Sequence, residues 1–372
     1  MNQRKTNIVI IAVMSVLLFG LAVFAWVKPA DEYSLSERRR LSQRPELTAE
    51  SLLAGGDKSF MTKFEDYATD QFPLRDEFRT VYSVVSLYAL AEKEINGIYL
   101  MGRHAVKVEY PLDQVSIDWA LERFSDLNAR FFQGRPVYLC VIPDKNYFLA
   151  KESGHPSLDY EALFAELREK TADYAEYVDV TGLLDVGDYY YTDTHWRQDK
   201  ITDVAEYLAQ QMGTEAYDSY RTMTLDTPFY GVYYGQAALP LAPDSLTYLT
   251  NDEMEGLEVL CLDNGTPEAN PLYDLEKAAG KDGYELFLSG SKALITMENP
   301  NAATDKELVI FRDSFGSSLA PLLTHGYRKV TLVDVRYISP RYLNNFVDFE
   351  NADILLLYST TLLNDSRRLL LE

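Results

Sequence analysis

An aspartate and a histidine stand two residues apart in the segment YYYTDTHWRQDK, residues 189–200. Side chains two positions apart project to the same side of an extended segment. We therefore expect Asp193 to accept a hydrogen bond from one imidazole nitrogen of His195, which leaves the other nitrogen free to take a proton. A serine hydroxyl is a poor nucleophile until such a base assists it, so this pair predicts serine chemistry.

A matching serine follows an apolar strand in ELVIFRDSFGSSLAPLL, residues 307–323. The strand is expected to end at Phe311. Because Pro321 fits best within the first turn of a helix, the helix is expected to begin just after Gly316. Ser314 then lies at the carboxyl edge of a parallel sheet, where α/β proteins usually bind ligands. Unpaired N–H groups at a helix start can stabilise an oxyanion there, so the segment predicts a nucleophile.

Each of these residues also has a plain structural explanation. His195 also fits a hydrogen-bonded structural histidine, Ser314 a helix N-cap and Asp193 the cap of a turn. Asp313 is expected to hold its turn rather than to react. Trp196 fits packing as well as stacking on a sugar, and both readings stay open.

Two further residues follow the apolar run KVTLVDV at its carboxyl end. Arg336 and Tyr337 fit a ligand contact there, and equally a structural ion pair. The other three histidines stand in turn-like or polar segments, and no function is assigned to His104, His155 and His325.

The elements that must position these residues alternate along the chain. Helical periods at residues 116–132, 160–174 and 203–212 alternate with apolar, strand-like runs such as VYLCVIP, LEVLCL, ELVIF and DILLLY. Continuous apolar strands separated by helices predict an α/β fold with a mostly parallel sheet covered on both faces. Residues 97–108 predict a hairpin that turns at Gly102. Residues 214–256 lack a clear pattern and are expected to form an irregular insertion.

The N-terminal segment predicts a membrane helix. Residues 8–27 carry no charge, which matches the roughly 20 apolar residues that cross a bilayer. Arg4 and Lys5 precede the segment, so we expect residues 1–28 to be a signal anchor with a cytoplasmic N-terminus. A cleaved signal peptide is the alternative. Residues 29–48 then read as a stalk and 49–372 as one extracytoplasmic catalytic domain.

Composition narrows the function classes. The 372 residues carry a net charge of −22, and such a surface repels nucleic-acid phosphates. Hydrophobic residues make up 47 % of the chain, enough for a packed core rather than disorder. The two cysteines, Cys140 and Cys261, lie in apolar runs and are expected to be packed thiols, with a disulfide between them as the alternative in an oxidising compartment. The scattered histidines show no metal-ligand spacing, so neither a metal nor another cofactor is expected.

Several motifs together resemble the DHHW family. They are DTHW, RDSFGSS, ERRRLSQRPELT, FEDYATDQFPLRDEF, GIYLMGRHAVK, VIPDK and VDVRY, and they cover most of the chain beyond the anchor. DHHW proteins are similar to the SGNH-hydrolase-like domains of alginate O-acetyltransferases. The resemblance implies that fold, with Ser314 as nucleophile, His195 as general base and Asp193 as its orienting partner.

The sequence departs from the family pattern at two positions. Thr194 stands where the family name implies a second histidine, and the Asp-x-His arrangement does not need that histidine. Ser291, in FLSGSKALI, stands where such proteins often have the asparagine of a Gly-Gly-Asn motif. The N–H groups of Ser314 and Ser291 are therefore the expected oxyanion donors.

The function implied by the resemblance is a membrane-anchored O-acetyltransferase that modifies a cell-surface polysaccharide through an acyl-serine. A separate multi-pass membrane acetyltransferase is the implied source of acetyl groups. Two alternatives stay open. One is a carbohydrate acetylesterase with the same triad and water as acceptor, and the other is a non-catalytic glycan-binding protein of the cell envelope.

Overall fold

The computed structural model describes residues 3–262 and 265–369. Contacts within the chain divide it into two compact units, Met1–Ile95 with Tyr234–Pro240 and Asn96–Tyr233 with Leu241–Glu372. The stalk and catalytic-domain boundaries expected from the sequence remain predictions.

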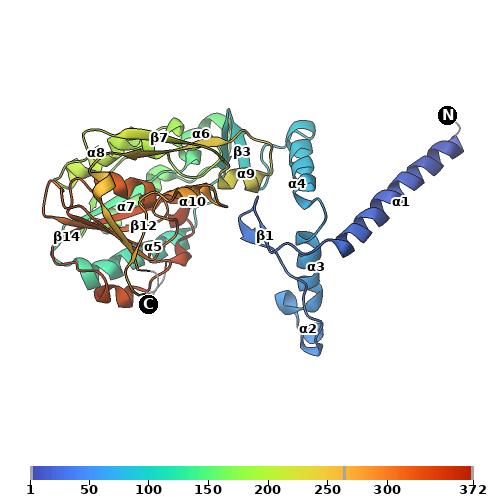
Figure 1. Cartoon of the computed structure of the whole chain (residues 1–372), viewed down its shortest axis with the longest axis horizontal. Helices are drawn as coiled ribbons and strands as arrows, with labels where there is room; N and C mark the ends of the chain where they lie inside the picture. Colours follow the sequence, from blue (N-terminus) through green and yellow to red (C-terminus); the bar gives the residue numbers. More distant parts are fainter. Residues whose placement is uncertain (1–2, 263–264, 370–372) are drawn as a thin grey trace. The chain divides into compact units, whose positions relative to one another are not determined.

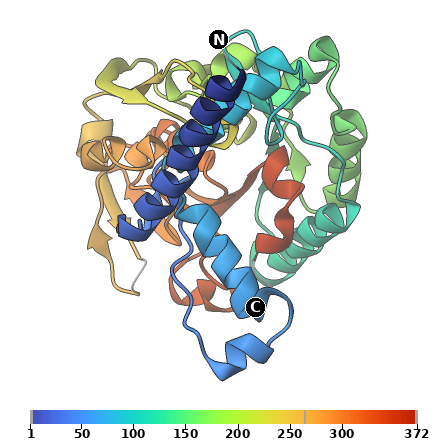
Figure 2. The same cartoon turned by 90° about the vertical axis from the view of Figure 1, so that its right-hand side faces the viewer.

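The first unit begins with the long helix α1, Gln3–Val27, which Figure 2 shows as one straight, unbroken helix. By length and composition α1 is able to cross a membrane, and none of its residues is buried. A signal sequence near the N-terminus has the same properties, so both readings of the segment stay open.

The rest of the first unit contains short helices and a small β-pair. The Asp70 carboxylate, in helix α3, accepts hydrogen bonds from both Arg39 Nη atoms, at 2.8 and 2.6 Å, and from the Ser42 N–H at 2.8 Å. These bonds connect the segment after α1 to helix α3. The guanidinium holds the pKa of Asp70 well below its usual range. The elements are β1 (Tyr33–Ser34), β2 (Arg39–Arg40), α2 (Ala49–Leu53), α3 (Phe60–Asp70) and α4 (Arg75–Val84).

The second unit is built on an eight-stranded sheet with the order β10-β9-β11-β13-β12-β14-β5-β6. Two of its strands, β12 and β14, are labelled in Figure 1. The neighbouring strands from β13 through β12, β14 and β5 to β6 pair in parallel. The pairs β10–β9, β9–β11 and β11–β13 are antiparallel. The expected mostly parallel α/β sheet is confirmed. Its strands are β5 (Val137–Ile142), β6 (Glu176–Tyr177), β9 (Glu258–Cys261), β10 (Glu268–Ala269), β11 (Leu294–Glu298), β12 (Glu307–Arg312), β13 (Lys329–Val333) and β14 (Ala352–Ser359).

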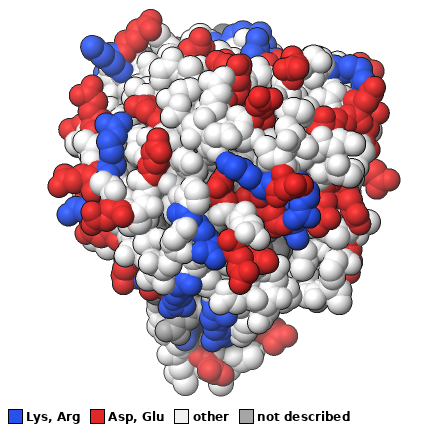
Figure 3. Space-filling view, turned by 90° about the vertical axis from the view of Figure 1, so that its left-hand side faces the viewer, with Lys and Arg blue, Asp and Glu red and all other residues white. Residues whose placement is uncertain are grey.

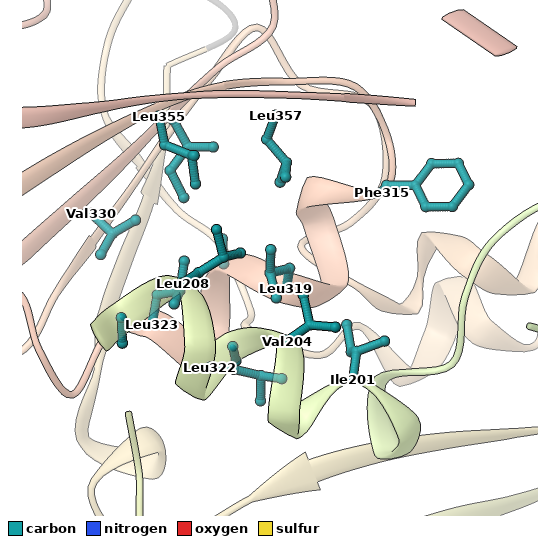
Figure 4. Close-up of a cluster of buried hydrophobic side chains, with 14 of the residues drawn as sticks. Ile201, Val204, Leu208, Phe315, Leu319, Leu322, Leu323, Val330, Leu355 and Leu357 are labelled. Atoms are coloured by element: carbon teal, nitrogen blue, oxygen red, sulfur yellow. The ribbon is translucent and has the colours of Figure 1, made fainter. Parts of the chain in front are cut away.

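Helices cover both faces of this sheet, as the alternating pattern predicts. Leu308 and Ile310 of β12 pack into one buried cluster, while Val309 and Phe311 pack into the other. The first cluster includes α8 (Thr202–Gln211), α11 (Gly316–Leu319) and the 3-10 turn η9 (Ala320–Leu323), whose apolar side chains meet the sheet in Figure 4. The second includes α5 (Gln114–Leu127) and α7 (Tyr160–Thr171).

Two smaller features complete the second unit. The expected hairpin is β3 (Ile98–Met101) and β4 (His104–Lys107), turning at Gly102 with φ +59°. The segment near 214–256 is more regular than its sequence indicates, because β7 (Arg221–Phe229) and β8 (Asp244–Thr250) pair as an antiparallel ribbon. Most of β7 is exposed, so its sequence lacks the alternation that marks a half-buried strand. The remaining helices of the second unit are α6 (Lys145–Ser153), α10 (Leu275–Ala278) and α12 (Thr360–Leu363), while most of α9 (Val232–Ala237) belongs to the first unit.

The surface and the cysteines agree with the composition. Figure 3 shows Asp and Glu side chains spread over one face of the molecule, with Lys and Arg side chains between them. Cys140 and Cys261 are free, buried thiols. The expected packing role therefore fits both, and burial raises the pKa of Cys140 above its ordinary value.

Candidate active site

Ser314 lies where the inner strand β12 gives way to helix α11. The strand ends at Arg312 and the helix begins at Gly316, each one residue from the boundary expected from the sequence. A Cβ at Gly316 would lie 2.8 Å from the Arg312 Cβ, so only glycine fits this close turn. Asp313 anchors the turn, since it accepts hydrogen bonds from the Ser359 N–H (2.9 Å) and hydroxyl (2.6 Å). Ser314 is thereby held at the carboxyl edge of the sheet.

Asp193 and His195 lie on a tight loop that closes on itself. Tyr189 and Trp196 form an antiparallel bridge, and the Tyr190 N–H donates to the His195 carbonyl at 3.1 Å. The loop therefore reverses direction at residues 192–194. Asp193 also accepts a hydrogen bond from the His195 backbone N–H at 3.0 Å, so the reversal itself directs the carboxylate toward the imidazole.

The structure brings the three predicted residues into hydrogen-bond contact. His195 Nδ1 lies 2.6 Å from Asp193 Oδ1, and His195 Nε2 lies 2.7 Å from Ser314 Oγ. A carboxylate only accepts hydrogen bonds, so Nδ1 carries the imidazole proton and Nε2 accepts from the serine hydroxyl. The orientation is the one that proton transfer from serine to histidine requires.

Aromatic rings fix the imidazole in this orientation. The Tyr284 ring stacks on the His195 ring, with centroids 3.7 Å apart and planes 5° from parallel, and the Phe315 ring approaches at 4.9 Å. The Tyr284 hydroxyl is itself held by Ser318 Oγ at 2.8 Å. His195 is 8 % exposed and Asp193 fully buried, so the pair is largely shielded from water while Ser314 stays partly open.

The second carboxylate oxygen of Asp193 is held by the segment after β7. The Val232 N–H donates to Asp193 Oδ2 at 2.8 Å, and the Gly231 N–H donates to Thr192 Oγ1 at 2.9 Å. A Cβ at Gly231 would lie 2.3 Å from the Asp193 Cβ. This close approach therefore needs a glycine, which no local sequence signal indicated.

Trp196 is fully buried in the core. Its ring has no exposed surface, and its Nε1 donates to Ser318 Oγ at 2.9 Å. A sugar cannot stack on a ring without exposed surface, so of the two readings the packing role fits and the substrate contact does not.

Arg336 is engaged in an ion pair within its own turn. Its Nε and Nη2 donate to the two oxygens of Asp334 at 2.8 and 2.6 Å, and this carboxylate raises the pKa of Arg336. Of the two readings of Arg336, the structural ion pair is the one seen. Tyr337 is 54 % exposed beside it, so it remains open to a ligand.

The two expected oxyanion donors differ in their surroundings. Within the described residues the Ser314 N–H meets no hydrogen-bond acceptor, so it stays available to an oxyanion. Ser291 is exposed and follows a left-handed run with φ of +57° at Leu288, +58° at Ser289 and +86° at Gly290. Across the same described ranges, Ser291 makes no hydrogen bond to Ser314, and its role stays a prediction.

Comparisons with known proteins give one family match and several similar folds. A family model described as DHHW protein matches residues 184–333, a segment that contains Asp193, His195 and Ser314. No curated protein matches the sequence. Among solved structures, a DHHW family protein from Eubacterium siraeum is 17 % identical, covers 75 % of this chain and 98 % of its own, and superposes with a TM-score of 0.55.

Bacillus cereus PatB1 is also similar in fold. It is 16 % identical, the alignment covers 72 % of this chain and 96 % of PatB1, and the TM-score is 0.59. A second PatB1 structure, with a sulfonyl adduct, gives a TM-score of 0.58 over 72 % of this chain and 97 % of that one, also at 16 % identity. Identities this low speak for the fold alone. The expected resemblance is confirmed: residues 184–333 match the DHHW family model, and the chain shares the α/β fold of the solved DHHW family protein and of PatB1.

Proposed function

We propose that this chain is a serine-dependent O-acetyltransferase that transfers acetyl groups to a cell-surface polysaccharide. The observation that carries the proposal is the unbroken line of short contacts from Asp193 through His195 to Ser314. Family membership of the segment that holds all three residues supports it.

In the first half-reaction, Ser314 Oγ attacks the carbonyl carbon of an acetyl donor while His195 Nε2 takes the hydroxyl proton. Asp193 stabilises the imidazolium that forms, and the Ser314 N–H donates to the oxyanion of the tetrahedral intermediate. Collapse of the intermediate breaks the bond to the donor's leaving group, which takes the proton from His195. The product is an acetyl ester on Ser314.

In the second half-reaction, a sugar hydroxyl attacks the acetyl-serine carbonyl and gives its proton to His195. The intermediate collapses to the acetylated sugar, and His195 returns the proton to Ser314 Oγ. Water in place of the sugar would complete an esterase cycle with the same residues, so acceptor binding and the exclusion of water decide between the two activities.

The proposed cellular setting follows from the N-terminal segment. Helix α1 anchors the chain in the membrane with its N-terminus in the cytoplasm, so the site works on the outer side. The acetyl donor is delivered there by a separate multi-pass membrane acetyltransferase.

The test incubates the full chain in detergent with 4-nitrophenyl acetate and mixed cell-surface oligosaccharides. Nitrophenolate release reports acyl-enzyme formation, and mass spectrometry of the sugars reports acetyl transfer. We expect acetylated sugar from the wild type and none from Ser314→Ala or His195→Ala, with exposed Ser245→Ala as the matched control. Nitrophenolate release without acetylated sugar would indicate the esterase. A folded chain that does neither would refute an acetyl-transfer function.

A further inference from the structure

Lys145 is a buried lysine beside the site, and the half-reactions above give it no role. It is the first residue of helix α6, directly after the N-cap Asp144, and it is 2 % exposed. Burying an ammonium group is costly, and a positive charge at a helix N-terminus opposes the helix dipole. Desolvation accordingly lowers the pKa of Lys145 to about 7. The cost of burying Lys145 must be offset by favourable contacts to its ammonium group.

The ammonium group binds the backbone of the loop that carries Asp193. Lys145 Nζ donates to the Tyr190 carbonyl at 3.0 Å and to the Tyr191 carbonyl at 3.2 Å. It also lies 4.9 Å from the centroid of the Tyr233 ring, a distance at which a cation and an aromatic face attract.

A carboxylate binds the same backbone through its N–H groups. Asp244 Oδ1 accepts from the Tyr191 N–H at 2.8 Å, and Oδ2 accepts from the Thr192 N–H at 2.8 Å and the Thr192 hydroxyl at 2.6 Å. Asp244 is 7 % exposed, so these bonds lie away from water. Two successive peptide groups therefore donate their N–H groups to the Asp244 carboxylate and accept from Lys145 Nζ through their carbonyls.

We propose that Lys145 and Asp244 form a clamp on residues 190–192 that positions Asp193 and His195 against Ser314. The clamp ends one residue before Asp193, so any shift of its two peptide groups is passed directly to the carboxylate. Neither clamp residue contacts Ser314, so both are positioning residues rather than catalytic ones. The expected effect of the clamp on the reaction rate rests on the proposed function. The expected effect of the clamp on the position of Asp193 and His195 does not.

The size of the effect follows from the short contacts at the site. The 2.6 and 2.7 Å contacts of His195 leave little room for a displaced loop. Misplacing a catalytic group by about 1 Å can slow a reaction roughly 100-fold. Loss of the clamp should slow formation of the acetyl-serine without weakening binding of a small ester, because neither clamp residue contacts Ser314.

The experiment compares Lys145→Met and Asp244→Asn with the wild type, using Lys151→Met, an exposed lysine of the same helix, as the matched control. With 4-nitrophenyl acetate we expect each clamp variant to lower kcat about 10- to 100-fold and to change KM less than about 3-fold. A clamp acting as one unit also predicts that the double variant is little slower than the slower single variant. A kcat within 2-fold of wild type in folded Lys145→Met and Asp244→Asn would overturn the proposal.

A second readout does not depend on activity. The proton on His195 Nδ1, in its short bond to Asp193, should give a downfield NMR signal, assigned by its loss in His195→Ala. We expect the signal to shift or disappear in Lys145→Met and Asp244→Asn and to stay in Lys151→Met. If the wild type lacks activity but the signal responds, the proposed function fails and the clamp stands. If one of the two clamp variants does not fold, the other clamp variant decides the test. An unchanged His195 Nδ1 proton signal in the folded variant refutes the clamp.

Discussion

Substitution of Gly231 tests whether the position of Asp193 controls the reaction. A Cβ at this residue would lie 2.3 Å from the Asp193 Cβ and 2.4 Å from its Cα and N. Non-bonded carbon atoms prefer separations of about 3.5–4.0 Å. Gly231→Ala must therefore push the two backbones apart by roughly 1 Å, and it stretches the 2.8 Å bond from the Val232 N–H to Asp193 Oδ2.

The expected loss in kcat is on the order of 100-fold, which corresponds to about 2.7 kcal/mol of transition-state stabilisation. Overpacking of this kind costs about 1–3 kcal/mol of stability, so the variant should still fold. The assay is steady-state hydrolysis of 4-nitrophenyl acetate by the full chain, with a thermal melt as the folding control. Gly182→Ala is the matched substitution, because its Cβ meets nothing within 4 Å. A folded Gly231→Ala variant with wild-type kcat would refute the reasoning.

Three further substitutions test the surroundings of the site. Asp193→Asn should lower kcat about 10⁴-fold, because an amide no longer holds the imidazole in its reactive tautomer; a loss below tenfold in the ester assay would argue against an orienting role. Tyr284→Phe removes the hydrogen bond to Ser318 Oγ and should lower the free energy of unfolding in urea by about 1 kcal/mol, with kcat nearly unchanged. An unchanged urea midpoint would contradict that bond. Burial lowers the pKa of Lys145 from 10.5 to about 7, so the unfolded chain binds this proton more tightly than the folded chain. Relative to Lys145→Met, the free energy of unfolding of the wild type should therefore rise by about 1.4 kcal/mol per pH unit between about pH 7 and 10.5. Equal pH slopes of this free energy in the two proteins would exclude the effect.

The sequence predicted the three residues that the structure brings into contact because each lies in a locally readable pattern. An Asp-x-His segment directs two side chains to one side, and an apolar strand followed by Arg-Asp-Ser and a small-residue helix start places Ser314 at the sheet edge. The alternating helices and strands were sufficient to predict the sheet and its two covered faces. These features depend on residues close together in the chain.

The surroundings of the site were not predicted, because they come from distant segments. Tyr284 stacks on His195 across 89 positions of sequence, and Asp244 binds a loop 52 residues earlier. Neither pairing leaves a periodic signal in the sequence. Lys145 stood in the quoted VIPDK motif, but only its burial and its two carbonyl partners indicate a role. Trp196 is the opposite case. Its position next to His195 left a ligand contact open, but the ring is wholly buried.

The central claim is that Ser314 becomes covalently acetylated with the help of His195. The most direct measurement incubates the full chain with an activated acetyl ester, quenches it with acid and maps the acetyl-sized mass gain by peptide mass spectrometry. We predict modification of the peptide that contains Ser314 in the wild type, and none at that position in Ser314→Ala or His195→Ala. A folded wild-type chain that hydrolyses the ester while Ser314 remains unmodified, or that labels equally well without His195, would contradict the claim.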